Sequence, residues 1–222
     1  RETDSSKGSF GPEAIGDALR AFRRAGVAPA NAVKDALARA AVFEAPRMTP
    51  KNIAGVMEGY AAAGESPPWS VVSAAVDAVA REAVNMDADE IADVVGAFAR
   101  ARVCGKLSAV AKSGLDDAVA REAPRMYARD VAAVTRAYAD CGEGAPGHGS
   151  LKPLVQAAMD TAASMHPVDA QSTLSALRKM GGGDGKTRKA LEAAASATSD
   201  QAMGLRRSMS PKEKRDAKRG DE

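Results

Sequence analysis

The sequence predicts an all-α protein: an α-solenoid of about five helix–turn–helix repeats of about 38 residues each. Of its 222 residues, 45% are hydrophobic, and much of that share is alanine, the best helix former. No run alternates strictly between apolar and polar side chains, as a half-buried strand requires. One amphipathic phrase also recurs at intervals of 38, 38, 40 and 39 residues, which is typical of helical repeats.

The recurring phrase is clearest at residues 86–102, where it reads as one complete helix. Asp87 can cap its N-terminus, and Glu90 lies three residues later as the second member of a capping box. The apolar residues of the phrase recur at helical spacing: Ile91, Val94, Val95 and Phe98. We call the residue that opens each copy its anchor; the anchors are Phe10, Met48, Met86, Met126 and Met165.

Equivalent positions of the five copies carry similar residues. Twelve residues after the anchor, an aromatic residue or leucine is expected at one interior position: Phe22, Tyr60, Phe98, Tyr138 and Leu177. Sixteen after it, four glycines of five suit a left-handed helix end: Gly26, Gly64, Arg102, Gly142 and Gly181. Two after it, proline opens three copies within the first turn: Pro12, Pro50 and Pro167. Small residues six and eleven after the anchor, such as Gly16 and Gly59, would let successive first helices approach closely.

A second helical pattern separates each anchored helix from the next. The expected second helices are Ala32–Glu44, Trp69–Val84, Leu107–Arg121, Leu151–Ser164 and Thr187 to about Met203. The chain therefore divides into an N-terminal segment (1–9), a repeat array (10–203) whose units begin near residues 10, 48, 86, 126 and 165, and a charged tail (204–222).

The phrase Met-x-Pro-x-x-Ile-Ala-x-Val-x-x-x-Tyr/Phe-Ala, read from Met48, resembles octotricopeptide and heptatricopeptide repeats. These repeats occur in organelle proteins of algae and apicomplexan-type protists, and the resemblance covers about residues 10 to 203. It implies a curved helical array that binds RNA in a mitochondrion or a chloroplast, as a maturation factor or an organellar ribosome component. The chain departs from the family in having only about five units and no recognisable C-terminal effector domain.

Charge tests that implication, because Lys and Arg contacts to phosphate supply most non-specific nucleic-acid affinity. The net charge is only +2, and residues 1–203 carry 24 basic against 25 acidic residues. Ten and fourteen residues after the anchors, however, basic residues gather on one helix face: Arg20, Arg24, Arg100, Arg136 and Lys179. Glu58 and Asp140 interrupt this row. The row is either a solvated helix face or a stripe that contacts phosphates.

The tail, GLRRSMSPKEKRDAKRGDE, is charged and poor in apolar residues, so it is not expected to fold alone. It holds seven basic residues against four acidic ones: Arg206, Arg207, Lys212, Lys214, Arg215, Lys218 and Arg219. The tail is either a solvated extension or a segment that orders along RNA or a partner.

The two cysteines, Cys104 and Cys141, are too few for a disulfide framework, which favours a reducing, intracellular compartment. They lie near the ends of first helices in neighbouring units and can approach one another, but they are expected to be packing or incidental thiols. No stretch has the length of apolar sequence that a membrane span needs. A chain that opens on Arg1 is consistent with a removed targeting peptide, a trimmed chain or an incomplete one.

Signals for chemistry are weak, so no catalytic residue, metal site or cofactor is expected. The GGGDGKT segment (181–187) has Met180 where a phosphate-binding loop needs glycine, and it is interpreted as the turn of the last unit. His148 and His166 have no partner at metal-ligand spacing and are expected at the surface. Trp69 is expected to pack against a neighbouring helix rather than stack on a base.

The sequence thus favours a non-enzymatic helical-repeat adaptor that binds RNA, ribosomal or other organellar, and neighbouring proteins of a large complex. A structural subunit of a mitochondrial ribosome or of an RNA-processing complex is the expected setting, with a plastid as the alternative organelle. The other hypothesis is a protein-only scaffold or assembly subunit of another organellar complex. A continuous positive groove would favour the first hypothesis, and a surface of mixed charge would favour the second.

Overall fold

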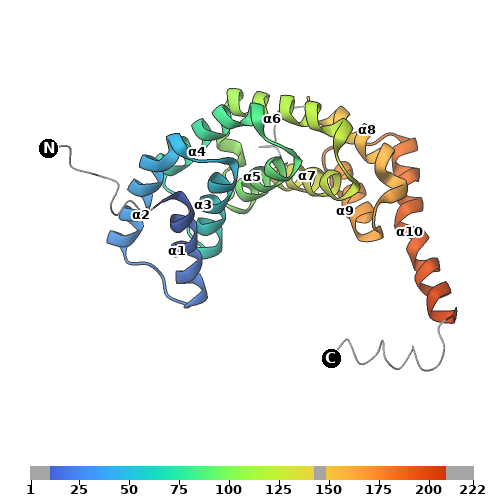
Figure 1. The fold of residues 1–222 in the computed structure, drawn as a ribbon, viewed down its shortest axis with the longest axis horizontal. Helices are drawn as coiled ribbons and strands as arrows, with labels where there is room; N and C mark the ends of the chain where they lie inside the picture. Colours follow the sequence, from blue (N-terminus) through green and yellow to red (C-terminus); the bar gives the residue numbers. More distant parts are fainter. Residues whose placement is uncertain (1–10, 143–148, 209–222) are drawn as a thin grey trace.

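Residues 11–142 and 149–208 are described by a computed structural model, with side chains as far as residue 196. In this part of the chain, ten α-helices alternate between two rows (Figure 1). The first helices of the units are α1 (Pro12–Arg24), α3 (Pro50–Ala63), α5 (Ala88–Arg100), α7 (Ala128–Cys141) and α9 (Pro167–Lys179). The second helices are α2 (Asn31–Glu44), α4 (Trp69–Glu82), α6 (Ala109–Glu122), α8 (Leu151–Thr161) and α10 (Gly185–Ser208).

The helices pack in a sequential, pairwise order, which confirms the predicted solenoid. Each first helix contacts the first helix of the next unit, and α2, α4, α6 and α8 follow one another in the same way. Figure 1 shows the result as an arch, with α4, α6 and α8 along its outer side and α3, α5, α7 and α9 along its inner side. Short 3₁₀ helices link the two rows: η1 (Ala45–Arg47), η2 (Ala83–Asn85), η3 (Cys104–Lys106), η4 (Ala123–Arg125) and η6 (Ala162–Ser164).

Local signals set the helix ends as the sequence predicts. The Asp87 carboxylate accepts a hydrogen bond from the Glu90 backbone N–H at 2.9 Å, and Glu90 accepts one from the Asp87 N–H at 3.2 Å. Pro12, Pro50 and Pro167 occupy the first helical position of α1, α3 and α9. All five residues sixteen after the anchors have positive φ, including Arg102 at 59°, the one copy without glycine. The repeat therefore imposes this backbone conformation even where the side chain opposes it.

A continuous apolar spine runs through the stack between the two rows. The residues five after the anchors are fully buried: Ile15, Ile53, Ile91, Val131 and Ala170. Burying a large aliphatic side chain contributes about 1.5–3 kcal/mol. Twelve after the anchors, Tyr60, Phe98, Tyr138 and Leu177 are also buried.

Phe22 departs from the predicted interior position because it is only half-buried. It lies on the first described helix, where no earlier unit covers α1 among the described residues. The aromatic spine therefore begins at Tyr60 rather than at Phe22.

The backbones of α1 and α3 touch where small residues meet. A Cβ atom added at Gly16 would lie 2.5 Å from the Gly55 carbonyl oxygen, and one at Gly59 would lie 3.1 Å from the Gly16 Cα. The predicted role of small residues at these positions is confirmed for this helix pair.

Two arginines on second helices bind the preceding unit, a feature that was not predicted from the sequence. Arg81 donates to the carbonyl oxygens of Ala45 and Met48, at 3.2 and 3.0 Å. Arg121, the equivalent residue one unit later, donates to the carbonyl oxygens of Val84 and Met86. Each arginine thus satisfies backbone acceptors at the end of the preceding second helix and ties consecutive units together. The repeated Arg-Glu-Ala sequence at 81–83 and 121–123 was the available signal.

Cys104 and Cys141 form a disulfide, so the prediction of separate thiols is wrong. The expected proximity is confirmed, since the two Cα atoms lie 5.5 Å apart. The bond joins η3, which follows α5, to the last residue of α7, and so it crosses the boundary between the third and fourth units. The cysteines therefore no longer support the predicted reducing compartment.

The remaining features of the described part agree with or refine the predictions. Residues 181–184 form the turn before α10, with positive φ at Gly181 and Gly183, as the interpretation of GGGDGKT requires. The last helix runs from Gly185 to Ser208 and so passes the expected end near Met203. No helix in residues 11–142 and 149–208 is long and apolar enough to cross a membrane.

Candidate functional site on the inner helix row

The exposed side of the first helices is the candidate functional surface. Residues three, seven, ten and fourteen after the anchors are exposed or half-buried, except the buried Gly96, and we call the surface that they form the inner surface. The helices that carry it lie along the inner side of the arch in Figure 1. The predicted basic row of Arg20, Arg24, Arg100, Arg136 and Lys179 belongs to this surface.

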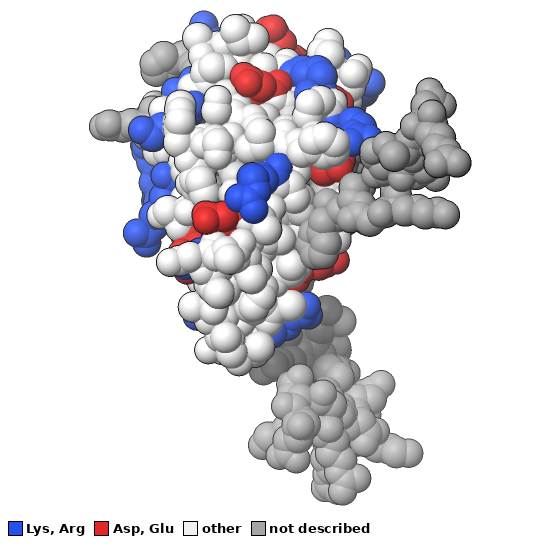
Figure 2. Space-filling model, turned by 90° about the vertical axis from the view of Figure 1, so that its left-hand side faces the viewer, with Lys and Arg blue, Asp and Glu red and all other residues white. Residues whose placement is uncertain are grey.

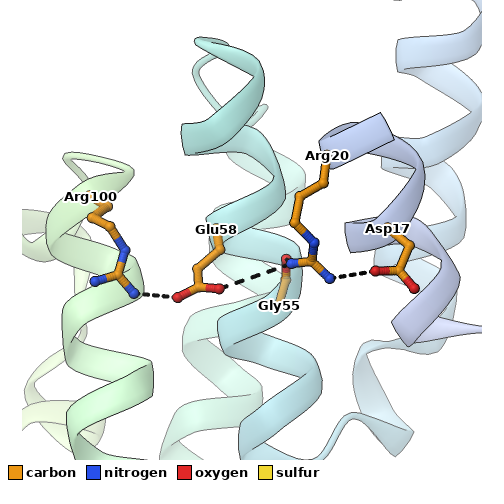
Figure 3. A network of polar contacts seen from close by, with 5 residues as sticks. All are labelled: Asp17, Arg20, Gly55, Glu58 and Arg100. Carbon is orange, nitrogen blue, oxygen red and sulfur yellow. Dashed lines mark hydrogen bonds and ion pairs between the residues drawn. The ribbon is translucent and has the colours of Figure 1, made fainter. Parts of the chain in front are cut away.

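Glu58 on α3 joins two members of the basic row (Figure 3). Its carboxylate forms an ion pair with Arg100 on α5, and its other oxygen lies 4.0 Å from the Arg20 guanidinium on α1. Arg20 also pairs with Asp17 at 2.7 Å and donates to the Gly55 carbonyl oxygen at 3.3 Å. This network therefore links three consecutive first helices.

The C-terminal half of the inner surface is paired in the same way. Arg136 lies 3.8 Å from the Asp169 carboxylate and donates to the Ser172 hydroxyl at 3.2 Å. Lys179 lies 3.7 Å from Asp140. Asp169, in the first turn of α9, thus pairs across to α7, the first helix of the preceding unit.

The basic row is therefore not a continuous positive stripe. Four of its five members pair with carboxylates, and the fifth, Arg24, forms no ion pair with a described residue. Such exposed pairs are worth about 0–1 kcal/mol each, so they can exchange for contacts with a partner. The sequence showed Glu58 and Asp140 in the row but not that they sit between the cations in space.

An acidic cleft lies in the N-terminal half of the inner surface. Its volume is about 390 Å³, and Glu13, Asp17, Glu58 and Asp93 line it together with Arg20 and Lys51. Partial burial, followed by repulsion from Glu58 and Asp89, raises the pKa of the Asp93 carboxyl above its usual value. A raised carboxyl pKa marks a place where added positive charge would be favourable.

Asp93→Asn is expected to stabilise the protein at pH 7 but not at pH 3. The raised pKa means that the folded state holds the Asp93 proton more tightly than the unfolded state does. Asp93 therefore contributes to stability at pH values below the pKa that it has in the unfolded chain. This contribution is lost as the pH rises through the higher pKa that Asp93 has in the folded protein. Thermal unfolding of both proteins at the two pH values measures the effect. An equal shift in melting temperature at pH 3 and pH 7 would contradict the electrostatic cause.

Trp69 is a second exposed feature, and its predicted packing role is wrong. The side chain is 64% exposed at the start of α4. The Lys106 ammonium lies 5.8 Å from the centre of its ring, a cation–π contact with the next unit. The ring is accessible on the surface of the array, away from the inner-surface network.

The other predicted contact residues fall at the end of the described chain. Arg206 and Arg207 belong to α10, but their side chains lie outside the described residues. Lys212, Lys214, Arg215, Lys218 and Arg219 lie outside the described residues altogether, as does His148. His166 is exposed at the start of α9, as expected, and its ring nitrogen accepts from the Val168 N–H at 3.4 Å.

No protein-family model matches the chain, and no curated protein matches it in sequence. In the described part of the chain, no group of three or more His, Cys, Asp or Glu side chains is placed to hold a metal ion. The fold and the charge arrangement of the inner surface are therefore the features that bear on function.

Proposed function

We propose that the protein is a non-enzymatic helical-repeat scaffold of an organellar complex, and that its inner surface docks a protein partner. One observation carries this proposal: the cations of the inner surface alternate with carboxylates of neighbouring helices. A polyanion approaching Arg20 or Arg100 would also meet Glu58. Mixed charge of this kind suits a protein segment that carries both signs, because complementary charges fix its register.

The acidic cleft supports the proposal and indicates the chemistry of the partner. Glu13, Asp17, Glu58 and Asp93 outnumber the two cations that share the cleft. A lysine or arginine of the partner would relieve the repulsion that acts on Asp93. The partner segment is therefore expected to present a basic residue to this cleft.

The second candidate is an RNA-associated subunit of a mitochondrial ribosome, or of its plastid counterpart. It is favoured by the seven basic residues of the tail and by the resemblance to octotricopeptide-type repeats. In this arrangement the tail contacts phosphates, while the inner surface still holds a protein neighbour. The mitochondrial location remains part of this proposal.

Crosslinking of the protein in organelle extract, with and without nuclease, tests the first proposal. We expect the same protein partners after nuclease treatment, and we expect Glu58→Lys/Asp93→Lys to lose them. Asp160→Lys, which changes an exposed charge on the outer helix α8, is the matched control. Loss of every partner on nuclease treatment would overturn the proposal.

The salt dependence of RNA binding distinguishes two modes of RNA contact: contact through the tail, as in the second candidate function, and direct contact through the inner surface. Removal of residues 209–222 is expected to lower the magnitude of the slope of log K against log salt by up to about 3.5, since five basic residues leave the chain. Arg100→Ala/Arg136→Ala is expected to leave that slope unchanged. A lower slope in this double variant would place RNA on the inner surface instead.

A further inference from the structure

The two edges of the array, where the helices of the two rows are joined, differ in charge. Within a unit, a turn joins the first helix to the second, and between units a 3₁₀ helix leads back to the first row. We call the turns within units, with four residues of each flanking helix, the turn edge: 21–34, 60–72, 97–112, 138–142, 149–154 and 176–188. These ranges hold twelve Lys or Arg residues and three Asp or Glu residues.

The opposite edge, defined in the same way between the units, is acidic. Its ranges, 41–53, 79–91, 119–131 and 158–170, hold six basic and nine acidic residues. The near-neutral net charge of the repeat array thus results from two edges of opposite sign. Figure 2 faces α1 and α2 and shows a broad area with few charged side chains, so positive charge is not spread evenly over the molecule.

Contacts between neighbouring turns make the turn edge one continuous surface. The Lys34 ammonium lies 2.5 Å from the Glu65 carboxylate, which joins the first turn to the second. The cation–π contact between Lys106 and Trp69 joins the second turn to the third, and the disulfide joins the third to the fourth. The side chain of Leu151, at the start of α8, packs close to Gly182 in the fifth turn. A single partner can therefore contact several turns at once.

Most cations of the turn edge are available to such a partner. Four of the twelve are in ion pairs, and the other eight form no ion pair with a described residue. The carboxylates of this edge, by contrast, already have partners. Glu65 and Asp140 are in ion pairs, and Asp184 accepts a hydrogen bond from the Thr187 N–H at 2.7 Å. The turn edge therefore attracts anions, unlike the mixed inner surface.

Large apolar side chains are exposed among these cations, one at each of the first three turns. Val27 is 58% exposed, Trp69 is 64% exposed and Val110 is 69% exposed. The phosphates of a nucleic acid would match the cations but would leave the two valines in water. The surface of an anionic bilayer matches both features, because its headgroups are negative and its interface accepts tryptophan and short apolar side chains.

We propose that the turn edge docks the protein on the surface of an anionic lipid bilayer. Val27, Trp69 and Val110 enter the headgroup region, and the unpaired cations bind the lipid headgroups around them. Each such cation strengthens binding about fivefold. The proposal goes beyond the scaffold function and does not depend on it, since the inner surface stays free for a protein partner.

Trp69 is the only tryptophan of the chain, so its fluorescence reports directly on the turn edge. The full chain is mixed with vesicles of phosphatidylcholine that contain about 30% phosphatidylserine, and with vesicles of phosphatidylcholine alone. With the anionic vesicles we expect co-sedimentation that weakens at raised salt, together with a shift of the Trp69 emission to shorter wavelength. With phosphatidylcholine alone, we expect binding at least about tenfold weaker.

Paired variants on the two edges test which surface binds. Lys106→Gln/Lys186→Gln removes two unpaired cations of the turn edge and should lower the vesicle partition coefficient about thirtyfold. Arg125→Gln/Arg129→Gln removes the same charge from exposed sites on the opposite edge and should change it less than about twofold. Trp69→Ser should weaken binding roughly tenfold, whereas Tyr127→Ser, at an exposed aromatic of the opposite edge, should not. Circular dichroism checks that each variant keeps the helical fold.

Three results would each overturn the proposal. Vesicle binding with unchanged Trp69 emission would assign the affinity to another part of the chain, such as the basic tail. Equal losses in the two charge variants would show that binding has no preferred edge. Binding of polyuridylate that quenches Trp69, without binding of vesicles, would make single-stranded RNA the partner of this edge.

Discussion

Reduction of the Cys104–Cys141 disulfide is expected to lower the free energy of unfolding by about 4 kcal/mol. The two cysteines are 37 residues apart in sequence, so the bond closes a long loop and restricts the unfolded chain. The bond also crosses the contact between the third and fourth units. Without it, these two units would separate as soon as α5 and α7 lose their packing.

Urea unfolding at 25 °C, with and without reductant, measures this effect. The double variant Cys104→Ser/Cys141→Ser serves as the control, because it should match the reduced wild type and ignore the reductant. Equal unfolding midpoints for the oxidised and reduced wild type would contradict the prediction.

Gly16→Val is expected to destabilise the protein by roughly 3 kcal/mol. Even the first carbon of the new side chain would lie 2.5 Å from the Gly55 carbonyl oxygen, and backbone atoms cannot move aside as a flexible side chain can. The α1 helix must therefore shift away from α3 and loosen the burial of Ile15 and Leu19.

Gly55→Ala is the matched control in the facing helix. A Cβ atom there meets nothing within 4 Å, so the variant should gain up to about 1 kcal/mol from helix propensity. Thermal and urea unfolding of both variants test the pair. A Gly16→Val variant as stable as the wild type would show that the two backbones do not touch in solution.

The features that the sequence predicted correctly are those that depend on residues close together in the chain. Asp87 and Glu90 cap a helix through hydrogen bonds across one turn, and Gly64 ends one through its own backbone freedom. The constant spacing of the five copies also predicted that successive units stack in chain order, because equivalent apolar residues must share one spine. Each of these inferences needs only the period of the pattern.

The features that the sequence did not predict depend on contacts between units. Arg81 looks like any exposed helix residue until its distance to the Ala45 carbonyl is known. Glu58 was read as an interruption of the basic row, whereas in space it joins Arg20 and Arg100. Phe22 was expected inside by analogy with its equivalents, but no earlier unit covers α1 among the described residues. Trp69 was expected to pack against a neighbouring helix, but its ring is exposed at the start of α4. Comparison of the repeats predicts the contacts of an average unit. It does not predict burial at a position whose surroundings differ from those in the other units.

The covalent link between the third and fourth units has a mechanical consequence. A solenoid bends like a spring, by adding small rotations at each contact between adjacent units. The Cys104–Cys141 bond fixes one such contact near the middle of the arch. Bending on binding another molecule is therefore concentrated in the units on either side of this contact. If the chain were pulled from its two ends, the disulfide would prevent residues 105–140 from extending.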